Sequence, residues 1–212
     1  MQRKVLLLGG VVFVALVLTA VVGIGGSTPG TNASGEKLAS FYSDNSIRQG
    51  IGAFVIALAG LFLVLFGVGL ATALGTRDQG GLSLWGHVLI GGTILAAGSV
   101  LLTAFVHFAL ANGGDENISP AAMQALNSLD GNTWMMFNPA LGVMMLGAAG
   151  VLLPGSAQRW LGWAALVLGV ALFIPFVDFF ALLATLLWIP VAGIVLARSE
   201  AKPAYIAAPG TA

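Results

Sequence analysis

The sequence predicts an all-α, polytopic membrane protein: a bundle of six transmembrane helices with both termini in the cytoplasm. Of its 212 residues, 58% are hydrophobic and only 8% are charged, and the mean hydropathy is +0.98. An average soluble domain carries about 25% charged residues, so most of the surface must face lipid. Long apolar segments separated by polar links, and an uneven distribution of basic residues among those links, are the other two observations.

Charge and cysteine content exclude several classes of function. The eight basic and eight acidic residues leave no net charge, and no basic face for a nucleic acid is expected. The chain has no cysteine, which excludes disulfides, thiolate catalysis and cysteine-ligated metal centres. We therefore expect no nucleic-acid partner and no cofactor.

The first span is expected over residues 5–24. Arg3 and Lys4 precede this apolar run, as they would in a signal peptide, but the apolar region of a signal peptide has only about 7–15 residues. A helix of about 20 residues crosses the ~30 Å hydrocarbon core. We therefore expect an uncleaved membrane anchor.

The second span is expected over residues 51–74, which contain no charge. A short helix over residues 36–45 should precede it, because Leu38, Phe41 and Tyr42 recur at helical spacing. The apolar face of that helix would lie on the bilayer surface or pack on the bundle.

The third span, expected over residues 84–110, is the most polar. Ser99, Thr103 and His107 recur every four residues and share one face. With Asp178, expected at the same membrane boundary, they form a candidate polar stripe that could line a path or relay protons. The structural alternative is that the hydroxyls bond carbonyls of the preceding turn and that Asp178 caps the last helix.

The rest of the chain predicts one short helix and three more spans in the same single domain. Ser119 and Pro120 favour the start of a helix at the membrane interface. Within the last span, Pro190 and Trp188 could mark a hinge or a small cavity. The three spans are expected at residues 134–153, 160–174 and 179–197, and a flexible tail at 199–212.

Orientation follows from the basic residues, which are enriched on the cytoplasmic side of membrane proteins. With six spans and the N-terminus inside, only Lys37 and Arg48 lie outside. The cytoplasmic basic residues are then Arg3, Lys4, Arg77, Arg159, Arg198 and Lys202. We therefore expect a multi-pass protein of the plasma membrane.

A dense polar stretch just before the second span supplies a candidate recognition cluster: Tyr42, Asp44, Asn45 and Arg48. As a functional site it would bind a lipid headgroup or a partner protein on the extracytoplasmic face. As a structural device it would mark where the second span begins. Asp44 and Arg48 could pair along the helix, a contact that contributes about 0–1 kcal/mol when exposed.

The sequence gives less support to a metal site, a haem site or an enzyme active site. His87 and His107 lie about 30 Å apart along one helix and cannot share an ion. A haem held by His107 and a methionine of the fourth span is possible in principle. An enzyme would require Asp44, Arg48, His107 and Asp178 to converge at the outer surface. No recognisable motif positions a nucleophile, so we expect no catalytic activity.

The pattern Phe41-Tyr42-x-Asp44-Asn45-x-x-Arg48 before an apolar helix resembles the signature of a family of multi-pass membrane proteins, common in actinobacteria, whose function is unknown. The resemblance extends to Arg159-Trp160-Leu161-Gly162-Trp163 and to Leu187-Trp188, and it covers most of the chain between Phe41 and Ala197. It implies a helical bundle in the plasma membrane. It supplies no activity, cofactor or catalytic residue.

These observations predict a non-enzymatic integral membrane protein that binds lipid or serves as an accessory or structural bundle. The expected partners are membrane lipids and other membrane proteins or a second copy of the chain. The alternative is a transporter or permease for a small, weakly polar compound. A continuous cavity along the polar stripe would favour transport, whereas a packed bundle with an apolar outer groove would favour lipid binding.

Overall fold

The computed structural model describes residues 2–74, 81–114, 118–154 and 158–199. These residues are mostly helical and contain no β-strand, which confirms the all-α fold class. All but Ser199 of the expected tail lies outside the described residues. The elements are α1 (Gln2–Leu18), the π-helix η1 (Thr19–Gly25), α2 (Gly35–Leu74), α3 (Leu84–Gly113), α4 (Pro120–Gly131), α5 (Trp134–Leu152), α6 (Arg159–Ala171) and α7 (Asp178–Arg198).

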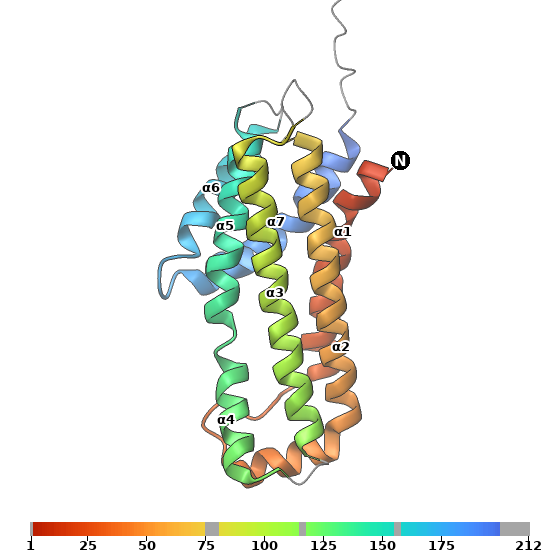
Figure 1. Ribbon diagram of the computed structural model, residues 1–212, viewed down its shortest axis with the longest axis vertical. Helices are drawn as coiled ribbons and strands as arrows, with labels where there is room; N and C mark the ends of the chain where they lie inside the picture. The colour runs from red at the N-terminus through yellow and green to blue at the C-terminus, as the bar shows by residue number, and fades with distance from the viewer. Residues whose placement is uncertain (1, 75–80, 115–117, 155–157, 200–212) are drawn as a thin grey trace, which may run out of the picture.

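Helices α1, α2, α3 and α5 run along the length of the bundle (Figure 1). α2 packs on α1 and α3, α3 packs on α5, and the α6–α7 hairpin leads from α5 back to α1. The start of α1 and the end of α7 lie at the same end of the bundle, and α4 lies at the opposite end (Figure 1). Both ends of the described chain are therefore on one side.

Five helical segments are long and apolar enough to cross a membrane. α6 is the shorter apolar helix, with 13 residues, and it extends about 20 Å, against a hydrocarbon core of ~30 Å. The turn from α6 to α7 is apolar and exposed: Phe176 is 92% and Phe173 47% accessible. A turn of this composition is suited to contact with lipid rather than water.

The main core depends on close helix contact through small residues. A Cβ atom added to Gly147 of α5 would lie 2.4 Å from the backbone nitrogen of Leu89 on α3. One added to Gly92 of α3 would lie 2.3 Å from the backbone nitrogen of Met144. Because lipid provides little hydrophobic drive between helices, such close backbone approach is a main source of their packing energy.

Trp188 joins the two helices of the hairpin. Its indole Nε1 donates a hydrogen bond of 3.1 Å to the carbonyl oxygen of Leu161 on α6, and its side chain is buried. The indole N–H is therefore satisfied by packing of α7 on α6. Pro190 lies within α7, which continues through it to Arg198.

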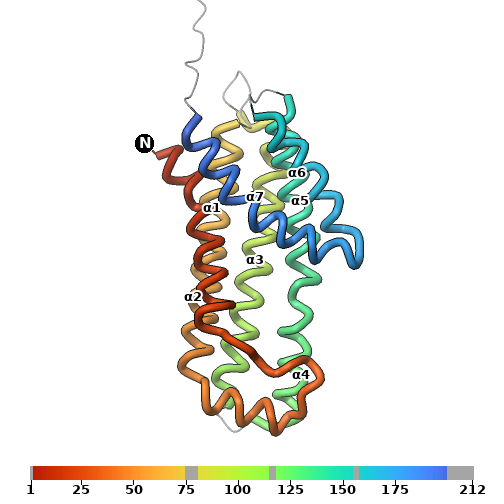
Figure 2. The backbone as a smooth tube through the Cα atoms, turned by 180° about the vertical axis from the view of Figure 1, so that it is seen from behind, coloured from red at the N-terminus to blue at the C-terminus, as the bar shows by residue number. Residues whose placement is uncertain are grey.

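The end of the bundle opposite the termini has its own small core. α2 is one continuous helix of 40 residues, whereas the sequence suggested a short helix and a separate span; its first turns lie across the end of the bundle, and the rest runs along the bundle (Figure 2). Its first turns pack Leu38 and Tyr42 against Leu110 of α3 and Met123 of α4. Residues 26–34 cross from η1 to α4 before α2 begins (Figure 2). We call residues 26–50 and 118–133 the cap.

Candidate functional site

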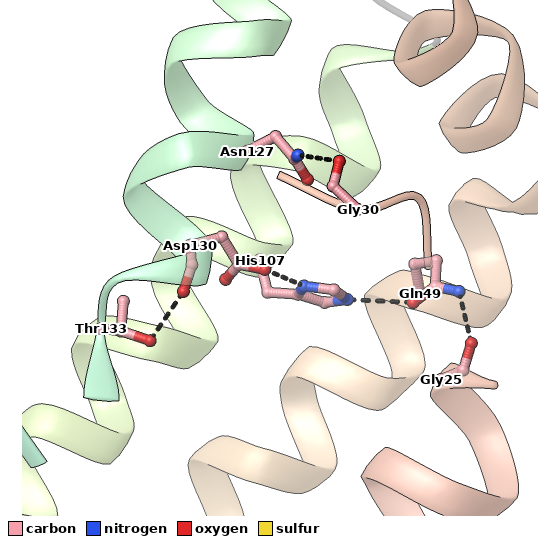
Figure 3. Close-up of polar contacts among 7 residues, drawn as sticks. All are labelled: Gly25, Gly30, Gln49, His107, Asn127, Asp130 and Thr133. Atoms are coloured by element: carbon pink, nitrogen blue, oxygen red, sulfur yellow. Dashed lines mark hydrogen bonds and ion pairs between the residues drawn. The ribbon is translucent and has the colours of Figure 1, made fainter. Parts of the chain in front are cut away.

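Three polar side chains from three different helices meet where the cap joins α3: Gln49 of α2, His107 of α3 and Asp130 of α4 (Figure 3). His107 Nδ1 lies 3.0 Å from Asp130 Oδ2, and His107 Nε2 lies 2.9 Å from Gln49 Oε1. Gln49 Nε2 in turn donates to the carbonyl oxygen of Gly25, at the end of η1, over 3.0 Å. We call Gln49, His107 and Asp130 the polar cluster.

His107 is held between two oxygen atoms by its ring nitrogens. A carboxylate accepts only, so Nδ1 of His107 must donate to Asp130. The amide nitrogen of Gln49 is used on Gly25, which turns the accepting oxygen of Gln49 toward Nε2. Each ring nitrogen of His107 therefore lies within hydrogen-bond distance of an oxygen atom, one on α4 and one on α2.

The polar cluster lies far along α3 from the end of the bundle that holds the termini. At about 1.5 Å per residue, His107 is about 35 Å along α3 from Leu84, slightly more than the ~30 Å hydrocarbon core. Trp134, which begins α5 near the cap, is 48% exposed, as expected of an aromatic residue at the interface. A hydrocarbon core that began at the start of α3 would therefore end near the polar cluster.

Two cavities adjoin at this place. The first, of about 200 Å³, is lined by all three residues of the polar cluster together with residues of η1. The second, of about 320 Å³, is almost wholly apolar and lies between α1, α5 and α7. Val21, Ile56 and Thr103 line both, so the two cavities share a wall. We call them the polar cavity and the groove.

The groove faces the side of the bundle. Phe13 and Val17 of α1 line one wall, and Phe137 of α5 and Leu186 of α7 line the others; Figure 2 shows α1, α5 and α7 from this side. Val21, at the edge, is 54% exposed. An apolar chain could therefore enter the groove laterally from the membrane.

Tyr42 is fully buried in the small core of the cap, and not on the surface where the sequence suggested a recognition cluster. Its ring meets that of His107 edge-on, with centroids 6.0 Å apart. Burial, and secondarily the charge of Asp130, raise the pKa of Tyr42 above its usual range. Among the described residues, neither its hydroxyl nor Oδ1 of Asp130 has a hydrogen-bond partner, although both atoms are buried.

The other members of the recognition cluster remain outside. Asp44, Asn45 and Arg48 line a surface depression of about 590 Å³. Asn45 Nδ2 donates to the carbonyl oxygen of Phe41 over 2.8 Å, within its own helix. Arg48 Nε donates to the carbonyl oxygen of Ile24 and so fixes the end of η1. The expected cluster is therefore divided between a buried tyrosine and a surface that anchors η1.

The polar stripe also divides. Ser99 donates to the carbonyl oxygen of Leu95 over 2.9 Å and is buried, so its hydroxyl is used locally. Thr103 donates to the carbonyl oxygen of Ser99 over 3.0 Å, yet it also lines both cavities. His107 belongs to the polar cluster. Two of the three residues on α3 therefore reach a cavity.

Asp178 does not lie beside His107, so the proton relay considered for the polar stripe does not form. Asp178 accepts a 3.0 Å hydrogen bond from Asn138 Nδ2 on α5, and its other oxygen accepts from the backbone N–H of Phe179. It is the first residue of α7, after Val177 at the N-cap position. The physical reason is that Asp178 sits at the turn of the α6–α7 hairpin, while Asp130 of the cap occupies the place beside His107.

The enzymatic constellation considered from sequence does not assemble. Arg48 bonds η1, and Asp178 bonds α5. His107 bonds Gln49 and Asp130 instead. His87 sits near the start of α3, with Nδ1 2.8 Å from the carbonyl oxygen of Ser83. Within the part of the chain that the structure describes, no three histidine or acidic side chains are grouped to hold a metal ion.

Two residues of the polar cluster, Gln49 and Asp130, were not foreseen. A signal for Asp130 is present in α4, where Met123, Asn127 and Asp130 follow at i, i+4 and i+7 and so share a face. Met123 and Asn127 are buried, and Asn127 Nδ2 donates to the carbonyl oxygen of Gly30 over 3.1 Å. Polar residues on the buried face of a short helix mark contacts with the rest of the protein.

Comparison with known proteins supplies no relative: no family model, curated protein or solved structure matches this chain. The resemblance to a family of multi-pass membrane proteins therefore stays a prediction. Function must be argued from the polar cluster and the two cavities.

Proposed function

We propose that the protein is a non-enzymatic, multi-pass protein of the plasma membrane that binds one amphiphilic lipid molecule. The lipid's apolar chain lies in the groove, and its polar end lies in the polar cavity. Burial of apolar chain surface stabilises little relative to bulk lipid, so the polar end supplies most of the selectivity.

The shared wall of the two cavities carries this proposal. A polar pocket of about 200 Å³ and an apolar groove of about 320 Å³ meet at Val21, Ile56 and Thr103. Sites for small molecules are mostly apolar with a few convergent polar groups. Here the polar groups are at the membrane boundary and the apolar lining lies on the membrane side, which is the order of groups in a lipid.

Transport of a small, weakly polar compound is the second candidate. Thr103 and His107 favour it, because both line the polar cavity. A transported compound must also leave at the other end, and there the hydroxyl of Ser99 is used within α3 and Trp188 closes α7 onto α6. Lipid binding therefore ranks first.

Orientation is part of the proposal. We place the cap outside the cell and both termini in the cytoplasm, on the basis of the excess of basic residues in the links at the termini end. A reporter fused after Ala212 should be active in the cytoplasm. Activity of that fusion only outside the cell would reverse the orientation.

The decisive test of lipid binding is to fill the junction of the two cavities. In Ile56→Trp the larger side chain should fill the space where the two cavities adjoin and so exclude the lipid. The wild-type chain and the variant are purified in a mild detergent from the same cells, and co-purifying lipids are counted by native mass spectrometry. We expect about one retained lipid per wild-type chain and a clear loss in the variant.

The matched control is Leu61→Trp. Leu61 is on the same helix and 54% exposed, and it lines neither the polar cavity nor the groove. This variant should retain lipid as the wild type does. Equal retention in all three proteins would contradict the proposal, and loss of a co-purifying protein instead of a lipid would favour an accessory subunit.

A further inference from the structure

We infer that the bound lipid is a phospholipid with a zwitterionic head: its phosphate lies on the guanidinium group of Arg48, and its ammonium group lies against the carboxylate of Asp44. The inference rests on the proposed lipid-binding function and specifies the head of the ligand. It follows from the position of Arg48 between the polar cavity and the surface depression, from the donors that Arg48 leaves open, and from the unpaired carboxylate beside it.

Arg48 lies where the polar cavity meets the surface depression. Gly26 lines the polar cavity, and a Cβ atom added to this glycine would lie 2.8 Å from Nη2 of Arg48. Arg48 itself lines the depression, together with Ile24 at the end of η1. A lipid whose chain occupies the groove can therefore extend its head through the polar cavity to the guanidinium group.

The guanidinium group of Arg48 is held in place and has donors open to a ligand. Its Nε donates to the carbonyl oxygen of Ile24, which orders the side chain. The side chain is exposed, and no described residue accepts a hydrogen bond from Nη1 or Nη2. A guanidinium group presents parallel N–H donors that match two oxygens of a phosphate. Because the side chain is already ordered, binding a phosphate costs little further conformational entropy.

Asp44 specifies the second charge of the head. It lies one helical turn before Arg48 and lines the same depression, yet the two exposed side chains form no ion pair within the part of the chain that the structure describes. Residues four apart on a helix have Cβ atoms about 5–6 Å apart. The two-carbon link between the phosphate and the ammonium group of a phosphoethanolamine head can cover that separation. A purely anionic head would instead place uncompensated negative charge beside Asp44.

The test compares three lipids with the same chains. Dioleoyl phosphatidylethanolamine carries the phosphate and the ammonium group, dioleoyl phosphatidylglycerol carries the phosphate alone, and dioleoylglycerol carries neither. Each is titrated into the purified full chain in an uncharged detergent at low ionic strength, and the bound fraction is measured by native mass spectrometry. We expect the affinity to fall about threefold from the first lipid to the second, as for an exposed ion pair. It should fall about tenfold more for dioleoylglycerol, which lacks the hydrogen bonds of a charged phosphate.

Two substitutions then locate the contacts. Arg48→Gln should weaken both phospholipids about tenfold and leave dioleoylglycerol unchanged. Asp44→Asn should weaken phosphatidylethanolamine alone, by about threefold. The matched controls are Lys37→Gln and Glu36→Gln, which make the same changes of charge at exposed residues of α2 that line neither cavity nor the depression. Both controls should bind all three lipids as the wild type does.

The outcomes separate the inference from the function on which it rests. If Arg48→Gln weakens dioleoylglycerol as much as the phospholipids, Arg48 acts only through the end of η1 and the phosphate contact is wrong. If Asp44→Asn keeps the preference for phosphatidylethanolamine over phosphatidylglycerol, the ammonium contact is wrong. Equal binding of all three lipids to the wild-type chain would contradict the zwitterionic head, although the groove would still bind lipid. If none of the three binds to the wild-type chain, lipid binding itself fails.

Discussion

The membrane core and the cap of this protein are held together by different means. In the core, α3 and α5 meet where Gly147 and Gly92 leave room for backbone contact, and apolar side chains fill the rest. In the cap, hydrogen bonds between side chains join α2, α3 and α4 through His107. Close packing is the effective interaction between helices in lipid. Buried hydrogen bonds between side chains are the effective interaction in the cap.

The difference indicates where the two regions tolerate change. A closely packed glycine leaves no space for an added atom, whereas a hydrogen-bonded cluster can lose one member while the helices stay folded. We therefore expect substitutions in the core to act on the whole fold and substitutions in the cap to act locally. The following experiments test this contrast, from the largest expected effect to the smallest.

Gly147→Ala should have the largest effect, because the added Cβ would lie 2.4 Å from the backbone of Leu89. Separating α3 from α5 should cost about 3 kcal/mol of unfolding free energy, measured in mixed micelles with increasing denaturing detergent. The same change at Gly91, where a Cβ would meet nothing within 4 Å, should not lower stability. Similar losses in both variants would contradict packing as the cause.

Asp130→Ala should act on the cap alone. It removes the hydrogen-bond partner of His107 Nδ1, which should cost about 1–3 kcal/mol locally. Hydrogen exchange should then quicken in the cap helices and stay slow in the middle of α3 and α5. Asp44→Ala, at an exposed carboxylate, is the control and should change exchange little. Faster exchange throughout the bundle would show that the two regions are not separable.

Alkaline pH should weaken the cap through Tyr42. Burial and the charge of Asp130 raise the pKa of Tyr42 in the folded protein, while the same group ionises at about pH 10 when unfolded. Its contribution to stability is thus complete below about pH 10 and is lost as the pH rises further. The melting temperature of the lipid-free wild type should therefore fall more steeply above about pH 10 than the melting temperature of Tyr42→Phe. Equal slopes would indicate that Tyr42 is not held protonated.

Phe176→Gly should give the smallest effect and the opposite sign. Phe176 has a backbone φ of 67°, in the left-handed region that a bulky side chain disfavours. Glycine should relieve that strain and stabilise the α6–α7 turn by about 0.5–1 kcal/mol. The same change at Phe180, inside α7, should destabilise by about 1 kcal/mol. Destabilisation at both positions would mean that the phenyl ring of Phe176 matters more than its backbone.

Much of the fold could be predicted, because the relevant signals are local. Apolar length located the long helices, and Ser119 and Pro120 marked the start of α4, where the Ser119 hydroxyl accepts from the backbone N–H of Ala122. The length of α6 was less accessible, since Leu172 and Ile174 extend the apolar pattern although the helix ends at Ala171. In a membrane, an apolar turn and an apolar helix have the same composition.

The site was predicted only in part, because it depends on contacts between distant segments. Thr103 and His107 of the expected stripe line a cavity, a point that the sequence left open. The partner of His107 could not be read from depth alone: Asp130 and Asp178 are both acidic residues near helix ends, and only the shape of the hairpin separates them. Gln49 was the hardest member of the polar cluster to predict, because it carries no charge, although it joins His107 to the end of η1.

The short hairpin of α6 and α7 has a consequence for the surrounding bilayer. It adds cross-section at the end of the bundle that holds the termini, and its turn ends before the level of the cap (Figure 2). The bundle therefore has a larger cross-section in the half that holds the termini than in the half next to the cap (Figure 2). We expect such a molecule to gather where the membrane bends, with the wider end on the convex side.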